Sequence, residues 1–459
     1  MSILAVMSVF SVTALIFIKT KGISTRRLFI FMLTFGLPIL PAKYILGSQM
    51  AIPVNFSLAD IFVVPAAFYL LFNKSRSEVQ IDLPLLRLFF LYFLWLVISL
   101  YAGNYKFGLE VSIPSNLVTF IKFWLLIIYF YLFKNLVRNY DDLKDFLLAS
   151  TLTGTLIALL GIGGALIYQV LGIPNMVSQA FRAMGTFGNP NMYSGYMLIS
   201  FFLAFIYFEL CGKRWQFYSL LAIFFLGLIM SASKGAMMGF VFAFITFAAL
   251  SKYRVKAFAI LLLLLIFASV AFLSSGKSSV YIDRLSQVGD TQTFSARSRI
   301  LLWSSALKVW QKSILLGVGS GNYGKVSGVF DERWQLYGRE YRTTLAQQGD
   351  QGADFVRVHS TYLSLLCETG IIGLLLFLTI IAFFFSRIVR SLLILDPSSS
   401  LHLTMVCLGA GMLGILAHSM VSNMENFRNM WCLAGVIYSV SDGALNPKMS
   451  QAFRLHQLK

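Results

Sequence analysis

The chain has 459 residues, of which 58% are hydrophobic and 12% are charged, and its formal net charge is +18. A soluble domain cannot cover that much apolar surface, so the composition excludes a soluble protein and predicts a multi-pass helical membrane protein. The basic excess is typical of loops on the cytoplasmic side of a membrane, and it gives no support to nucleic-acid binding.

Apolar segments long enough, or nearly long enough, to cross a bilayer follow one another along the chain. They cover residues 2–18, 28–47, 57–72, 84–101, 116–133, 146–170, 191–210, 215–231, 235–250, 257–274, 369–386, 398–423 and 430–441. The first segment precedes Lys19 and Lys21, which is typical of a retained anchor and not of a cleaved signal peptide. The first and last segments are the weakest, so the sequence predicts an all-α bundle of 12 or 13 transmembrane helices.

The basic residues alternate between the two sides of these segments. Twenty of the 37 Lys and Arg flank one side, and five lie in the short loops of the other side. The richer side is expected to face the cytoplasm. This alternation places the one long connection, residues 275–358, on the exterior side. We predict transmembrane helices 1–10 in residues 1–274, a large exterior loop with interfacial helices in 275–368, and C-terminal transmembrane helices with a cytoplasmic tail in 369–459.

Two parts of the long connection are predicted to be helical. The stretch "SRILLWSSALKVWQKSILLG" places apolar residues at helical spacing, which indicates a helix lying on the membrane–water boundary. Those residues are Trp303, Ala306, Leu307, Trp310 and Ile314. Residues 359–367 are expected to form a short interfacial helix, and Gly370 to precede the true span. Between these helices, "GVGSGNYG" lacks the P-loop lysine–hydroxyl pair, so we expect a flexible turn there and not a nucleotide loop.

His359 is the candidate for acid–base chemistry. It is the one histidine on the exterior side that lies outside every apolar segment, and Arg299 and Arg357 belong to the same loop. A capping or packing role is the alternative. We favour a functional role because titratable groups beside other charges concentrate at sites. His418 lies inside an apolar segment, where a hydrogen-bonded core histidine is the default and a supporting role at a site is the alternative.

Cations on the exterior side form a second set of candidates. Arg182 lies in the turn-rich segment "FRAMGTFGNPN", and Lys234 lies between two closely spaced segments. Lys234 fits snorkelling toward lipid headgroups as well as it fits function. Such cations suit an anionic group such as a phosphate. The sequence shows no pattern of metal-ligating residues, and no metal is expected.

The stretch between the glycine turn and His359 is a further candidate region, because it holds aromatic side chains and an arginine. They are Trp334, Tyr337, Tyr341 and Arg339. An ordinary solvated helical excursion fits this stretch equally well.

Four stretches together resemble the superfamily of O-antigen ligases and O-antigen polymerases, which are bacterial envelope glycosyltransferases. His359, Ser360, nine residues and "GIIG" fit its histidine motif, and "RAMGTFGNPN" is similar to its Arg-x-x-Gly-Thr-Phe-x-Asn-Pro-Asn segment. "SRILLW…LLGVGSGNYG" is similar to its Arg-x-x-x-Trp helix with a following glycine turn, and "LAHSMVSN" matches a further element. The resemblance covers residues 182–425.

The resemblance implies a GT-C-like membrane enzyme of the bacterial inner membrane whose active site faces the periplasm. It implies inverting, metal-independent transfer of a glycan from undecaprenyl diphosphate, without cofactor, to lipid A–core or to a second glycan. His359 and Arg299 take the catalytic positions, and Arg182, Lys234, Arg297 and Arg357 are expected to bind the donor diphosphate. Lys234 stands where many members carry an arginine, so the two-pronged contact of arginine is lost there.

The resemblance also implies an acceptor, and the stretch between the glycine turn and His359 is its candidate binding region. Trp334, Tyr337 and Tyr341 would stack on sugar rings, and Arg339 would meet phosphates or acidic sugars.

Other function classes stay open. A transporter or flippase of lipid-linked glycans would place charged, broken helices near the middle of the membrane. A protein O-oligosaccharyltransferase would use the same donor, whereas an envelope scaffold would not need His359. The motifs do not separate a ligase from a polymerase, and the sequence leaves the oligomeric state open.

Overall fold

The computed structural model describes residues 24–39, 57–72, 79–109, 113–212, 215–255, 294–327 and 357–445. These ranges are almost entirely helical. The helices are α2 (Thr25–Gly36), α4 (Asp60–Phe72), α5 (Leu83–Phe107), α6 (Ile113–Leu136), α7 (Tyr140–Leu171), α8 (Pro190–Cys211), α9 (Trp215–Met230), α10 (Lys234–Leu250), α13 (Phe294–Lys312), α14 (Tyr323–Ser327), α18 (Thr361–Ile394), α19 (Ser400–His418) and α20 (Arg428–Leu445). Two short strands, β1 (Ser178–Gln179) and β2 (Arg182–Ala183), form an antiparallel hairpin, which the turn η3 (Gly185–Phe187) follows.

The predicted all-α membrane architecture is confirmed. Within the described ranges, six helices are long and apolar enough to cross a membrane: α5, α6, α7, α8, α18 and α19. Three shorter apolar helices, α4, α9 and α10, accompany them. The expected spans at 2–18 and 257–274 lie outside the described residues, so the total of 12 or 13 stays a prediction. Two predicted spans run well past the ends of their helices. The span 398–423 is too long because α19 ends at His418 and a turn follows, and the span 28–47 is too long because α2 ends at Gly36.

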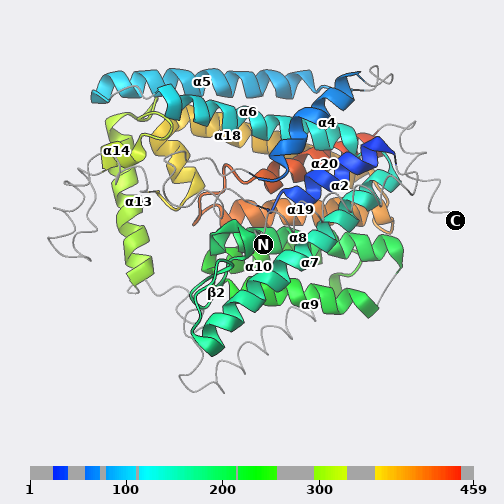
Figure 1. Cartoon of the computed structure of the whole chain (residues 1–459). Helices are drawn as coiled ribbons and strands as arrows, with labels where there is room; N and C mark the ends of the chain where they lie inside the picture. The colour runs from blue at the N-terminus through cyan, green and yellow to red at the C-terminus, as the bar shows by residue number, and fades with distance from the viewer. Residues whose placement is uncertain are drawn as a thin grey trace.

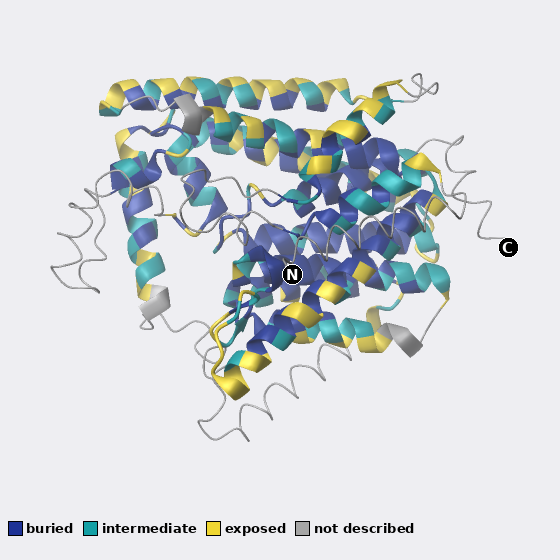
Figure 2. Ribbon diagram, in the orientation of Figure 1, coloured by how far each residue is buried: buried dark blue, intermediate teal, exposed yellow. Residues whose placement is uncertain are grey.

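The described helices form layers around α8 and α19. Helices α5, α6 and α18 lie along one another, while α8, α10 and α19 pack together in the middle of the molecule (Figure 1). Buried residues concentrate in these central helices and in α20, whereas α5 shows a continuous exposed face (Figure 2). An exposed apolar face on a long helix is what a lipid environment requires, because lipid tails cover it.

Helix α13 lies crosswise to the long helices at one end of the bundle, next to α14 (Figure 1). This placement agrees with the expected interfacial helix. Ala306 is 1% exposed and faces the protein, whereas Leu307 is 40% exposed, and Ile314, which follows the end of the helix at Lys312, is 50% exposed. Val309 and Val358 complete the small cluster beneath it, and the two tryptophans pack against its edge.

Helix α18 is broken at Gly370, and the segment around the glycine turn is hydrogen-bonded to both sides of this break. Gly370 has φ 68° and ψ −175°, a backbone conformation that essentially only glycine adopts, and it interrupts the helix where the sequence places the start of the span. The turn bonds across this break: Ile371 N–H donates to Ile314 O (3.0 Å), and Gly319 N–H donates to Glu368 O (2.8 Å). These hydrogen bonds hold the segment around the glycine turn to α18 on both sides of Gly370, whereas we expected a flexible turn.

Ion pairs join the helices at the end of the bundle opposite α13. Arg387 contacts Asp82 at 2.7 Å and Asp442 at 3.0 Å, and Lys134 contacts Asp442 at 3.6 Å. Paired charges of this kind specify a packing arrangement more than they add stability. Lys134 and Arg387, two of the basic residues assigned to the cytoplasmic side, therefore have partners within the protein.

Candidate functional site

His359 lies in the turn that leads into α18. Its φ is +56°, in the left-handed region, and its side chain is exposed while Val358 and Ser360 on either side are buried. A non-glycine residue in this region costs on the order of 1–2 kcal/mol, so the surrounding structure must impose the conformation. Ser360 then caps α18, because its side chain accepts the N–H of Leu363 at 3.4 Å. His359 therefore lies exposed directly before the N-cap of α18, and the predicted helix start at residue 359 is two residues too early.

Thr361 ties this turn to the segment that follows α19. Its N–H donates to Ser419 O at 2.9 Å and to Ser422 O at 3.2 Å. Its Oγ1 donates to Ser422 O at 3.0 Å, and it accepts the N–H of Met424 at 2.8 Å. Glu425 Oε2 lies 3.2 Å from the same oxygen. The position of His359 is thus set by "SMVSNME", a segment about sixty residues further along the chain.

His418, the last residue of α19, is the buried neighbour of that segment. Its exposed fraction is 1%, and among the described residues neither ring nitrogen has a hydrogen-bond partner. A Cβ at Gly195 of α8 would lie 3.5 Å from Nδ1, and a Cβ at Gly235 of α10 would lie 3.0 Å from Cδ2. The ring therefore fits between two glycines. The expected hydrogen-bonded core histidine is wrong in one respect, because the structure shows the core position without the hydrogen bonds.

Arg182 is held against the turn between α9 and α10. Its Nε donates to Ser231 O at 2.8 Å, and its Nη2 lies 3.4 Å from Asn191 Oδ1. The hairpin β1–β2 carries Arg182, and Gly185 and Gly188 follow with positive φ of 52° and 60°. This is the tight, turn-rich connection that the sequence predicts, and it presents a half-buried guanidinium beside the first turn of α8.

Lys234 is the first residue of α10, next to the same cluster. Ser233 caps the helix by accepting the N–H of Ala236 at 3.4 Å, and its hydroxyl also donates to Asn191 Oδ1 at 3.0 Å. The ammonium is therefore carried by a helix start that is tied to the segment holding Arg182. Gly235, which packs against the ring of His418, directly follows Lys234 in the chain.

Three helix starts meet the end of α19. Helices α8 and α10 approach it through Gly195 and Gly235, and α18 is bonded to it through Thr361. The N-terminal end of a helix carries a partial positive charge and outward-pointing N–H groups, which favour an anion. The bundle thus combines Arg182, Lys234 and these helix ends on one side of the turn that positions His359.

The α13 arginines differ in placement. Arg297 is exposed, whereas Arg299 is half-buried and its charge acts on His418. Arg299 therefore belongs to the same neighbourhood as Lys234 and His418, although the two segments are far apart in the sequence. The structure brings together Arg182, Lys234, Arg299, His359 and His418 at one end of the bundle.

Arg357 has charged neighbours of both signs. Its positive charge acts on the carboxyl groups of Glu368 and Glu425 and on the amine of Lys122. Burial raises the pKa of the Glu425 carboxyl above its usual value, and backbone hydrogen bonding and Arg357 oppose that rise. Arg428 is also occupied, because its guanidinium contacts Asp60 at 2.9 Å. The expected acceptor-binding residues Trp334, Tyr337, Arg339 and Tyr341 lie outside the described residues.

Several residues that shape the site were missed in the sequence. Asn191, Ser233, Thr361 and Glu425 make the hydrogen bonds described above, yet none was singled out. Ser233 carries a readable signal, since a serine directly before an apolar helix is a typical N-cap. Asn191 was noted only as part of the turn-rich stretch and as the last residue of the family-like segment "RAMGTFGNPN", without a role of its own. For Thr361 and Glu425 the sequence holds no local signal, because their partnership joins two distant segments.

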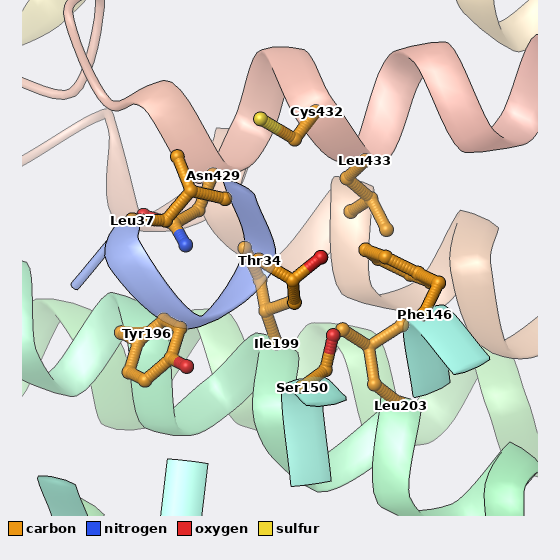
Figure 3. A pocket seen from close by; sticks show the side chains of 10 residues that line it. All are labelled: Thr34, Leu37, Phe146, Ser150, Tyr196, Ile199, Leu203, Asn429, Cys432 and Leu433. Atoms are coloured by element: carbon orange, nitrogen blue, oxygen red, sulfur yellow. The ribbon is translucent and has the colours of Figure 1, made fainter. Parts of the chain in front are cut away.

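A small cavity is lined by none of the site residues named above. It measures about 20 Å³ and is lined by α2, α7, α8 and α20, with Thr34, Ser150, Tyr196 and Asn429 as polar wall residues (Figure 3). Such a volume holds about one water molecule, so it has no room for a sugar or a lipid. In the part of the chain that the structure describes, no group of three His, Cys, Asp or Glu side chains is arranged to hold a metal ion.

Fold and geometry together define a multi-pass helical membrane protein with a histidine and several cations gathered at one end. Residues 219–378 match the model of a family described as O-antigen ligase. This match confirms, over these residues, the resemblance to the O-antigen ligase and polymerase superfamily. The matched range contains Lys234, Arg299 and His359, whereas Arg182 and His418 lie outside it. No curated protein matches the chain in sequence.

Proposed function

We propose that the protein is a glycosyltransferase that moves a glycan from undecaprenyl diphosphate to a hydroxyl group on the periplasmic face of the bacterial inner membrane. The observation that carries the proposal is the turn after α19. This turn is hydrogen-bonded to Thr361 at the start of α18, two residues after His359. His418, which directly precedes the turn, packs against Gly235 at the start of α10, next to Lys234. A base and an anion-binding group are thereby held on one short segment.

In the proposed reaction, the imidazole of His359 accepts the proton of the acceptor hydroxyl. The acceptor oxygen then forms a bond to the anomeric carbon, and the bond from that carbon to the diphosphate oxygen breaks. The electron pair leaves with undecaprenyl diphosphate. Attack from the side opposite the leaving group inverts the anomeric centre. General-base assistance of this kind typically contributes ~10²–10⁴-fold.

The leaving diphosphate develops negative charge as the bond breaks. Arg182, Lys234 and Arg299 supply positive charge there, helped by the N-terminal ends of α8 and α10. Fixed cations and helix ends can do this without metal assistance, and we propose a metal-independent reaction. The diphosphate linkage already carries the free energy of transfer, so no nucleotide is needed on the exterior side.

The acceptor decides between two reactions. A ligase would join a finished polymer to lipid A–core, and a polymerase would join one lipid-linked oligosaccharide to another. The direct test is product analysis with purified full-length protein and an undecaprenyl-diphosphate-linked oligosaccharide, with each acceptor offered separately. New glycan linkage with release of undecaprenyl diphosphate supports the proposal. Movement of the lipid-linked glycan across vesicles without any new linkage contradicts it and indicates a transporter.

A gene deletion separates the two reactions in the cell. A strain that keeps long free lipid-linked polymer but loses attachment to its surface acceptor identifies a ligase. A strain that attaches only single units identifies a polymerase.

A further inference from the structure

Asn191 lies where three segments of the candidate site meet. Its side-chain oxygen Oδ1 accepts the hydroxyl of Ser233 at 3.0 Å and lies 3.4 Å from Nη2 of Arg182. Asn191 belongs to the first turn of α8, Ser233 is the N-cap of α10, and Arg182 is in strand β2. An amide oxygen has two lone pairs, so both are used in joining these segments.

The backbone of Asn191 is fixed independently of these contacts. Asn189 caps α8, and its Oδ1 accepts the N–H of Asn191 at 2.8 Å and that of Met192 at 3.4 Å. Pro190 between them has a restricted φ that suits the first position of a helix. The backbone from which the Asn191 amide extends is therefore fixed at the start of α8, and the amide oxygen meets Arg182 and Ser233 from there.

This arrangement orients the guanidinium of Arg182. Two of its N–H groups meet acceptors on different segments, Ser231 O through Nε and Asn191 Oδ1 through Nη2. A planar group held at two of its nitrogens has little rotational freedom left. An arginine oriented in advance loses less entropy when it binds a phosphate than one that must be ordered by the ligand.

The same amide also sets the start of α10. The Ser233 hydroxyl donates to Asn191 while it accepts from Ala236 N–H, so the hydroxyl hydrogen points toward α8. Lys234 follows directly in the chain. Gly235, the next residue, packs against the ring of His418, so the first turn of α10 also contacts the end of α19.

We propose that Asn191 is a positioning residue for the donor diphosphate, whose side-chain oxygen holds Arg182 and the N-terminus of α10 so that both act on one diphosphate. This inference rests on the proposed function. The amide suits the task because a neutral carbonyl oxygen orients the guanidinium without cancelling its charge. A carboxylate at this position would orient Arg182 equally well, but it would neutralise the arginine and repel the diphosphate.

The test compares Asn191→Ala and Asn191→Asp in the purified full-length protein, with undecaprenyl diphosphate in detergent as the binding probe. Asn191→Ala removes the contacts to Arg182 and Ser233 and should weaken binding by ~10-fold, and Asn191→Asp should weaken it further, to ~100-fold. In an Arg182→Ala background, Asn191→Ala should weaken binding by clearly less than it does in the wild type, because only the contact to Ser233 is then left to lose. Equal binding by the Ala and Asp variants, or an unchanged effect of Asn191→Ala without Arg182, overturns the proposal.

Ser233→Ala and Thr246→Ala provide a matched pair on α10. The Ser233 hydroxyl donates to Asn191, whereas the Thr246 hydroxyl is exposed and bonds only to Phe242 O within the helix. We expect weaker binding for Ser233→Ala and wild-type binding for Thr246→Ala. This pair carries the test if Asn191→Ala does not fold, and equal binding by the two variants then overturns the proposal.

The binding assay also separates the two proposals. Wild-type protein that binds undecaprenyl diphosphate in the predicted order of variants but makes no glycan linkage contradicts the proposed function and supports the role of Asn191. Wild-type protein that does not bind the probe overturns the role of Asn191.

Discussion

Thr361 donates its backbone N–H to the carbonyl oxygen of Ser419, at a distance of 2.9 Å. His359 precedes the first of these residues by two positions, and His418 directly precedes the second. This hydrogen bond therefore joins the start of α18 to the end of α19. It brings the exposed His359 and the buried His418 to the same end of the bundle.

Replacing His359 tests the base in the proposed reaction. His359→Ala should abolish glycan transfer while expression and membrane insertion persist, because the side chain is exposed and its loss leaves no cavity. Transfer is measured in vitro with the lipid-linked oligosaccharide. His402→Ala is the control for a histidine remote from the site, since His402 lies about 24 Å from His418 along α19 at 1.5 Å per residue. Because His402 is buried, the two variants are compared at equal amounts of folded protein. A wild-type rate for His359→Ala would assign the residue to a capping role.

Replacing the α13 arginine tests the anion site. Arg299→Ala should weaken donor use by roughly ten- to a hundredfold, because one charge-assisted contact is worth about 1.5–3 kcal/mol. Arg299→Lys should recover only part of that loss, since it keeps the charge and loses the planar fork. The measurement is kcat/KM for the lipid-linked donor. Lys312→Ala, an exposed cation at the other end of α13, serves as the control, and equal values for both alanine variants would remove Arg299 from the site.

Thr361→Val tests whether the tie to the α19 turn positions His359. The change keeps the shape of the side chain but leaves the buried N–H of Met424 without its acceptor, which costs about 1–3 kcal/mol. We expect a lower melting temperature and a fall in kcat of ~10-fold with little change in the donor KM. Thr379→Val is the control, because that exposed hydroxyl bonds only to Leu375 O within α18. An unchanged kcat at Thr361→Val would show that the tie is structural only.

The sequence predicted the local features of this molecule better than its long-range contacts. Hydrophobic segments located the described spans from α4 to α10, and Gly370 was placed correctly before the span in α18. Asn191 and Thr361 were missed because their roles arise from contacts with residues about 40 and 60 positions away. The packing of α13 against Val358 was not predicted, since helical spacing alone does not tell which side of a helix meets a distant segment.

Gly370→Ala tests the break in α18. A Cβ at this position would lie 2.0 Å from Leu315 O, and the φ of 68° disfavours any side chain. We expect a loss of about 3 kcal/mol or more in the free energy of unfolding, together with loss of transfer, because the helix start carrying His359 would shift. Gly163→Ala is the control: no atom lies within 4 Å of a Cβ there, and alanine in a helix should add about 0.5–1 kcal/mol. Equal melting temperatures of the two variants would show that the break in α18 does not require glycine at position 370.

The pH dependence of stability tests the environment of Glu425. Because burial raises the pKa of this carboxyl, the folded state keeps its proton at pH values where the unfolded chain has lost it. The stabilising contribution is therefore complete below the ordinary pKa of 4.5, and it is lost as the pH rises through the raised value. Glu425→Gln mimics the protonated form and keeps a group that can bond to Thr361 Oγ1. Thermal melting of the detergent-solubilised protein from pH 4 to 8 should therefore show a smaller decline for Glu425→Gln than for the wild type. Parallel curves for the two proteins would show that the Glu425 pKa is not raised by folding.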